Sequence, residues 1–229
     1  MRTAVTLEIA CFNAPAAITA SQAGADRIEL CTDRSAGGTT PPLSWLTTVK
    51  AAVTIPVYVM VRPRGGDFDY TELEFLEMQR TISTYKGHAH GFVFGLLTPD
   101  RRVDVARTRV LVEMARPRPC TFHRAFDETK NLLEALEDVC ESGCEAILTS
   151  GGAETAAAGV EVLAMLVQRA AGRVVVMPGG GVRASNVQAI REATGAVVLH
   201  SSAVLGDSDE PDIKEIAHMR ELATAPLLR

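Results

Sequence analysis

The fold is decided by a nine-residue stretch, QAGADRIEL at residues 22–30, in which a helix ends, a glycine turns the chain and a strand begins. Gly24 suits the left-handed cap that closes many helices, and Arg27–Leu30 is rich in apolar residues, as a buried strand is. The same order recurs in ESGCEAIL at 141–148 and in EATGAVVL at 192–199. The sequence therefore predicts a chain built from repeated helix–turn–strand units.

Eight β-rich runs are spaced along the chain, with helical patterns between them and one at the end. Short loops and strict alternation predict a parallel sheet with right-handed crossovers. In 229 residues, eight such units favour a single α/β domain over residues 1–229, folded as a (β/α)8 TIM barrel with a parallel eight-stranded sheet. A doubly wound open sheet is the alternative. The predicted strands are Thr6–Ala10, Arg27–Leu30, Pro56–Val61, Gly91–Leu97, Pro119–Phe126, Ala146–Ser150, Val174–Met177 and Ala196–His200.

Capping residues mark where helices begin. Thr71 and Glu74 form a capping box at the start of a predicted helix over residues 71–85. Ser185 and Gln188 predict a second capping box, before a helix that ends at a glycine.

Composition excludes several classes of protein. The net charge of −5 and the lack of any Lys/Arg cluster argue against a nucleic-acid partner. No run of about 20 apolar residues predicts a membrane span, and the N-terminus lacks the apolar core of a signal peptide. Five cysteines without a CxxC pair indicate free thiols in a reducing cytoplasm.

Polar side chains inside the predicted strands are the strongest functional signal. Barrel enzymes gather their functional residues at the carboxyl ends of the strands, and an unpaired buried charge costs several kcal/mol. The alternative is a structural plug, in which the carboxylates pair with Arg27 or Arg62. The candidate catalytic residues are Glu8, Glu29, Arg62, His123 and His200.

Two loops predict an anion site. Phosphate sites of barrels often use the loops after strands seven and eight, where glycine N–H groups and a helix start meet the anion. The turn after strand three adds arginines, which bind carboxylate or phosphate with two bonds. A tight turn and a solvated basic loop are the alternatives that need no ligand. The candidate anion-binding residues are Arg64, Gly179, Gly180, Gly181 and Ser201.

Two cysteines follow the first two predicted strands at the same face of the barrel. Soft thiolates suit Cu(I), but cysteine is also a common small buried hydrophobe. Cys31 is the stronger candidate metal ligand and Cys11 the weaker one. Glu8, Glu29 and His123 are an alternative set for a divalent metal ion.

Eight motifs along the chain are specific enough to compare with known families. They are LEIAC at 7–11, GADRIELC at 24–31, GGTTP at 37–41, PVYVMVRPRGGDF at 56–68, FGLLTPD at 94–100, TFHRAFD at 121–127, LTSGG at 148–152 and MPGGGV at 177–182. These motifs resemble the CutC family closely, and the resemblance runs from about residue 6 to residue 200. It implies a barrel fold, a cytoplasmic location, a role in copper homeostasis and assembly into homodimers or larger homo-oligomers. Cysteines are the proposed Cu(I) ligands in that family, and Cys31 is the position that matches.

Three functions remain open from the sequence. The first is Cu(I) binding through Cys31, helped by Cys11 or His200. The second is an enzyme acting on a small anionic or phosphorylated molecule at the carboxyl face of the barrel. The third is a barrel without catalysis that serves as a regulator or scaffold.

Overall fold

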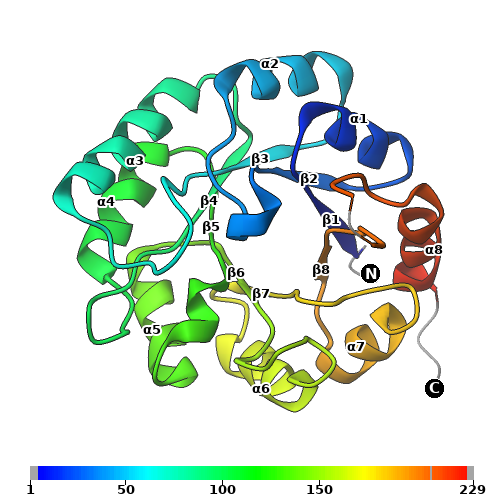
Figure 1. The fold of residues 1–229 in the computed structure, drawn as a ribbon. Helices are drawn as coiled ribbons and strands as arrows, with labels where there is room; N and C mark the ends of the chain where they lie inside the picture. The colour runs from blue at the N-terminus through cyan, green and yellow to red at the C-terminus, as the bar shows by residue number, and fades with distance from the viewer. Residues whose placement is uncertain (1–4, 207, 226–229) are drawn as a thin grey trace.

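Eight parallel strands form one sheet in the order β7-β6-β5-β4-β3-β2-β1-β8, which is the predicted TIM barrel (Figure 1). The computed structural model describes residues 5–206 and 208–225. β1 pairs with both β2 and β8, and β7 lies beside β8 to complete the circle, so the open-sheet alternative is wrong. The strands are β1 Thr6–Cys11, β2 Arg27–Leu30, β3 Val57–Met60, β4 Gly91–Phe94, β5 Cys120–Phe122, β6 Ala146–Thr149, β7 Val175–Pro178 and β8 Val198–Ser201.

Helices surround the sheet, as Figure 1 shows in the view along the barrel. Among the described residues, none of them is long and apolar enough to cross a membrane. They are α1 Ala14–Gln22, α2 Leu43–Ala52, α3 Glu72–Tyr85, α4 Val105–Ala115, α5 Leu132–Ser142, α6 Val160–Ala170, α7 Val187–Thr194 and α8 Ile213–Thr224, with short 3-10 helices η1 Arg34–Ala36 and η2 Arg124–Glu128.

One predicted capping box is confirmed and the other is wrong. The Thr71 side chain accepts a hydrogen bond from the N–H of Glu74 at the start of α3, and the Glu74 carboxylate accepts one from the N–H of Thr71. At α7 the cap position is Asn186 rather than Ser185. The Asn186 side chain accepts a bond of 2.8 Å from the backbone N–H of Arg183, which turns the chain before the helix can start.

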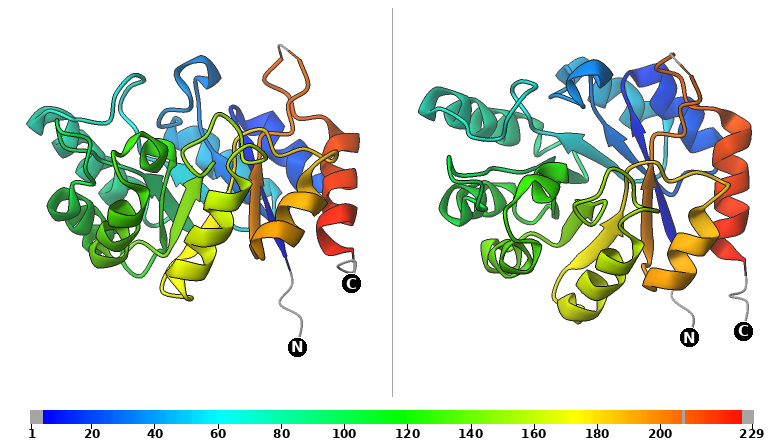
Figure 2. Two further views of the ribbon diagram at one scale, coloured as in Figure 1. Left: turned by 90° about the horizontal axis from the view of Figure 1, so that it is seen from below. Right: turned by 60° about the horizontal axis from the view of Figure 1, so that its bottom comes forward.

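Strands β4 and β5 are shorter than the sequence predicts. β4 ends at Phe94, before Gly95. β5 stops at Phe122, because the His123 side chain caps the 3-10 helix that follows. Its Nδ1 atom accepts a bond of 3.2 Å from the N–H of Ala125. His123 therefore lies beyond the end of β5, at the cavity in the barrel mouth. Figure 2 shows loops after β2 and β8 rising on one side of the barrel.

The barrel interior holds two small apolar clusters instead of one continuous core. The first contains Cys31, Met60 and Val93, and the second contains Leu148, Met177 and Val198. The large core lies between the sheet and the surrounding helices. The polar residues of β1, β2 and β8 occupy the interior, and they position the candidate site.

We expect Gly159→Ala to lower the free energy of unfolding by about 3 kcal/mol, the upper part of the range for overpacking. A Cβ atom at Gly159 would lie 1.9 Å from the carbonyl oxygen of Ser150, so the loop after β6 would have to move. Urea denaturation measures the change. Gly87→Ala is the matched control, because a Cβ atom there meets nothing within 4 Å; equal stability of the two variants would contradict the prediction.

Candidate functional site

Glu8 is the centre of a buried ion-pair network inside the barrel. The parallel register places it opposite Arg27 on β2 and opposite His200 on β8. Arg27 donates from Nε to one carboxylate oxygen, and His200 Nδ1 lies 2.7 Å from the other. The plug foreseen as the structural alternative therefore exists, with Arg27 as its cation. Glu8 is fully buried and does not line the cavity described below.

Glu29 lies next to this network but has few partners of its own. Its Oε2 atom is 3.9 Å from His200 Nε2 and accepts a bond of 3.5 Å from the Cys31 thiol. Its Oε1 atom is buried without a hydrogen-bond partner among the described residues. The side chain is 4% exposed. Glu29 is thus a buried carboxyl group with one oxygen available to a ligand.

The environments of these groups shift their pKa values in different directions. Burial tends to raise the pKa of Glu8, but the His200 bond and the Arg27 charge outweigh it, and the pKa lies below its ordinary value. Burial raises the pKa of Glu29. Burial tends to lower the pKa of His200, but the two carboxylates raise it overall. The surroundings therefore favour the charged form of Glu8 and the protonated forms of Glu29 and His200.

A cavity of about 210 Å³ opens at the carboxyl ends of the strands. It brings together eight of the twelve residues singled out from the sequence. These are Glu29, Cys31, Arg62, His123, Gly180, Gly181, His200 and Ser201.

Arg62 ties two loops together at the edge of this cavity. Its guanidinium donates to the carbonyl oxygens of Ala36, Gly38 and Gly66, at 2.7, 3.1 and 2.9 Å. It also lies over the ring of Phe68, 4.7 Å from the centroid. These bonds go to neutral oxygens, so they leave its positive charge beside the cavity without a counter-charge.

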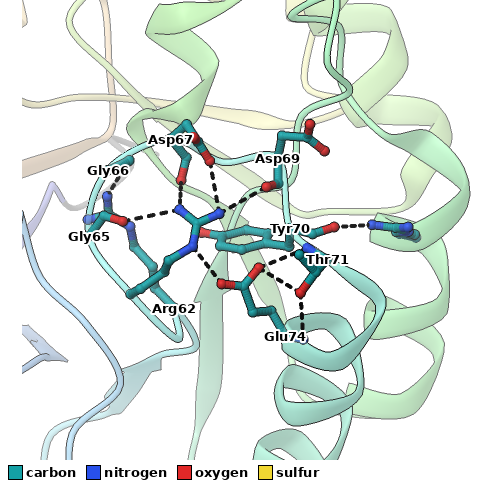
Figure 3. A network of polar contacts seen from close by, with 10 residues as sticks. Arg62, Gly65, Gly66, Asp67, Asp69, Tyr70, Thr71 and Glu74 are labelled. Carbon is teal, nitrogen blue, oxygen red and sulfur yellow. Dashed lines mark hydrogen bonds and ion pairs between the residues drawn. The ribbon is translucent and has the colours of Figure 1, made fainter.

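The structure does not bring Arg64 to the cavity. Its guanidinium bonds to Asp67 Oδ1 at 2.9 Å and to Glu74 Oε1 at 2.6 Å, in the network at the start of α3 (Figure 3). Two carboxylates already neutralise its charge. Sequence reasoning could not separate Arg62 from Arg64, because their different partners come from loop geometry.

The glycine loop after β7 and two further arginines also line the cavity. The N–H groups of Gly180 and Gly181 have no hydrogen-bond partner among the described residues. Gly179 serves packing instead, since a Cβ atom there would lie 2.3 Å from Leu148 Cδ1. Arg124 and Arg183 line the cavity but were not among the predicted site residues. Arg124 begins the 3-10 helix η2, although the sequence placed it inside the fifth strand, and Arg183 lies in the loop after β7.

Arg183 resembles Arg62 in leaving its charge unopposed, whereas Arg124 is paired. Arg183 donates to Ser201 Oγ at 3.1 Å and to the carbonyl of Val204 at 3.2 Å. Arg124 donates to Asp127 at 2.9 Å. Ser201, the last residue of β8, therefore orients Arg183.

The two candidate cysteine ligands point to opposite sides of the sheet. Cys31 packs with Met60 in the barrel interior and lines the cavity. Cys11 belongs to the core beneath the helices, and its thiol lies 3.7 Å from the carbonyl of Ile9. Burial raises the pKa of both thiols, and at Cys31 the nearby Glu29 raises it further. The structure therefore does not bring Cys11 and Cys31 together at one metal ion.

Another set of side chains has the spacing of metal ligands. Glu8, Glu29 and His200 each offer an atom within 4.8 Å of the others. The Arg27 guanidinium already pairs with Glu8 in this group, which opposes a cation at that carboxylate. His123 is not a member, so the predicted divalent-metal set of Glu8, Glu29 and His123 does not assemble.

His123 is buried at the cavity wall against Phe68, with ring centroids 4.9 Å apart. Burial and the positive charge of Arg62 lower its pKa to about 3. The imidazole is therefore uncharged at neutral pH.

The fold and the cavity together define a TIM barrel with a polar, positively charged site at the carboxyl ends of its strands. This chain belongs to the CutC family, whose model matches residues 5–205. The copper homeostasis protein cutC homolog of Homo sapiens is 45% identical over 198 residues, covering 86% of this chain and 72% of that protein. Family protein CutC of Chromobacterium violaceum is 43% identical, covering 86% of this chain and 80% of its own.

Solved structures agree with this assignment. CutC from Streptococcus agalactiae superposes with a TM-score of 0.81 at 29% identity, covering 86% of this chain and 98% of that one. N-(5'-phosphoribosyl)anthranilate isomerase from Pyrococcus furiosus has a TM-score of 0.65 at 13% identity, covering 96% and 98%. The second likeness is one of fold alone.

We expect His123→Gln to make the free energy of unfolding depend less steeply on pH below pH 6.5. The folded pKa of His123 lies near 3 and its ordinary value is 6.5, so below pH 6.5 the unfolded chain binds the proton that the folded chain excludes. Wild-type stability then falls with acidification, by roughly 1.4 kcal/mol per pH unit from this group. Urea denaturation between pH 7 and pH 4.5 measures the slope. His88→Gln, at an exposed position, is the control, and identical slopes in wild type and His123→Gln would refute the expectation.

Proposed function

We propose that this chain is an enzyme that binds a small anion in the cavity and transfers protons through Glu29 and His200. The observation that carries the proposal is the unpaired, buried Oε1 atom of Glu29 in a cavity that also contains Arg62 and Arg183. A buried polar atom without a partner costs free energy that a bound ligand can recover. This combination supports acid–base chemistry on an anionic substrate.

Proton transfer is supported by the pairing of Glu29 with His200. A general acid or base works best when its pKa lies near the working pH, and burial moves the pKa of Glu29 upward toward that range. Glu8 holds His200 through Nδ1, so Nε2 is left facing Glu29. His200 is thereby oriented toward the carboxyl group with which it would share a proton.

Anion binding is supported by the glycine loop after β7. Gly180, Gly181 and Arg183 line the cavity, and the N–H groups of the two glycines have no hydrogen-bond partner among the described residues. Gly180 and Gly181 have positive φ angles of 94° and 70°, which let the backbone turn sharply at this point. Backbone N–H groups together with an arginine favour phosphate or carboxylate.

We expect inorganic phosphate to raise the melting temperature of the wild-type protein in a concentration-dependent way, since a ligand that binds only the folded state stabilises it. Arg183→Gln removes a cavity charge and should weaken phosphate binding about tenfold or more, in line with the 1.5–3 kcal/mol of a charged hydrogen bond. Arg169→Gln, at an exposed position on α6, is the matched control. Equal phosphate affinity in all three proteins would contradict the proposed site.

A second candidate function is Cu(I) handling, with the ion as cargo. Cys31 and Met60 place a thiol and a thioether in one interior cluster at the cavity, and both sulfur groups are soft ligands that suit Cu(I). The relatives from Homo sapiens and Mus musculus carry the name copper homeostasis protein. The five unpaired cysteines support a reducing compartment, such as the cytoplasm, as the place where the chain works.

If copper is the cargo, reduced wild-type protein should bind one Cu(I) per chain in competition with a chelator under anaerobic conditions. Cys31→Ala should lose that binding. Cys11→Ala should retain it, because Cys11 faces the helices on the other side of the sheet. Binding that is indifferent to Cys31, or absent from the wild type, would eliminate this candidate.

A further inference from the structure

His123 has one nitrogen committed to the protein and one that is not. Nδ1 accepts a bond from the N–H of Ala125 at 3.2 Å. Nε2 is buried and has no hydrogen-bond partner among the described residues. The side chain is 4% exposed and belongs to the cavity wall.

These contacts fix the form of the imidazole. A nitrogen that accepts a backbone N–H carries no proton of its own, so the proton of the neutral ring must lie on Nε2. The charge of Arg62 and the burial of the ring keep the second proton away. His123 therefore presents an uncharged N–H group without an acceptor.

Gly95 and Phe68 pack against the imidazole ring of His123. A Cβ atom at Gly95 would lie 2.5 Å from Nδ1 and 2.7 Å from Cε1 of His123. Phe68 covers one side of the ring. The imidazole is thus held between a glycine and an aromatic ring, which preorganises the donor.

We infer that the Nε2–H group of His123 binds a carbonyl oxygen of the substrate, and that the substrate is a small anion carrying an aldehyde or ketone group. The inference rests on the proposed function. The arginines supply charge for the anionic end, whereas an uncharged, buried donor matches a neutral acceptor oxygen. A neutral imidazole can polarise a carbonyl without giving up its proton. The acid–base pair of Glu29 and His200 then lies in the same cavity as the polarised group.

The test is NMR of full-length protein labelled with 15N-histidine, with two probes. Dihydroxyacetone phosphate carries a ketone and a phosphate, and inorganic phosphate carries the anion alone. The spectrum of His123→Gln identifies the His123 signals. We expect the free protein to show the neutral tautomer with the proton on Nε2, and we expect the ketone phosphate to shift that signal strongly while inorganic phosphate leaves it in place.

Affinities in Gly95→Ala give a second measurement that does not remove the imidazole. The added methyl group should displace the ring and weaken dihydroxyacetone phosphate about three- to tenfold, the effect of one neutral hydrogen bond. Inorganic phosphate should bind unchanged. Gly87→Ala is the control with the same chemical change in open space, and it should bind both probes as the wild type does.

The outcomes separate this inference from the proposed function. Binding of both probes with an unmoved His123 signal, or a proton found on Nδ1, would overturn the inference and leave the anion site standing. If neither dihydroxyacetone phosphate nor inorganic phosphate binds the wild-type protein, the proposed function is overturned, and the inference with it.

Discussion

The candidate site depends on one buried carboxylate held between two cationic groups. Parallel pairing of β1 with β2 and with β8 sets Glu8 between Arg27 and His200. Breaking such a buried pair by removing one partner costs about 3–5 kcal/mol. The network also divides the barrel interior into two apolar clusters. Because Glu8 takes the charge of Arg27, the second carboxyl group, Glu29, is left without a cation of its own.

That asymmetry gives two chemically similar residues different tasks. Glu8 is charged, fully buried and bonded on both oxygens, so it fixes the orientation of His200. Glu29 is the carboxyl group that a ligand can reach, because it lines the cavity and keeps one oxygen unpaired. Pairs of titratable groups whose surroundings push their pKa values apart are typical of acid–base sites. The structural plug and the functional site are therefore parts of the same network.

The sequence predicted those properties that follow from strand order and alternation, and it missed those that depend on loops. Repeated helix–glycine–strand units predicted the barrel, and strand parity placed Glu29 and His200 at one mouth. Parity alone would also have separated Cys11 from Cys31, since the two side chains point to opposite faces. The partners of Arg64 come from a loop and a helix cap. No periodic pattern predicts such contacts.

Glu29 is where the two candidate functions make opposite demands. A Cu(I) ion at Cys31 requires the thiol to lose its proton. Burial makes that loss harder by raising the thiol pKa, and a charged Glu29 would raise it further. An anion instead requires Glu29 to keep its proton, since a protonated Glu29 does not repel a negative ligand. The positive charges of Arg62 and Arg183 then remain without a counter-charge. Burial raises the pKa values of Glu29 and Cys31, so it favours the protonated form of both groups. A cation at Cys31 would therefore bind against the effect of burial, whereas an anion beside Arg62 and Arg183 would not.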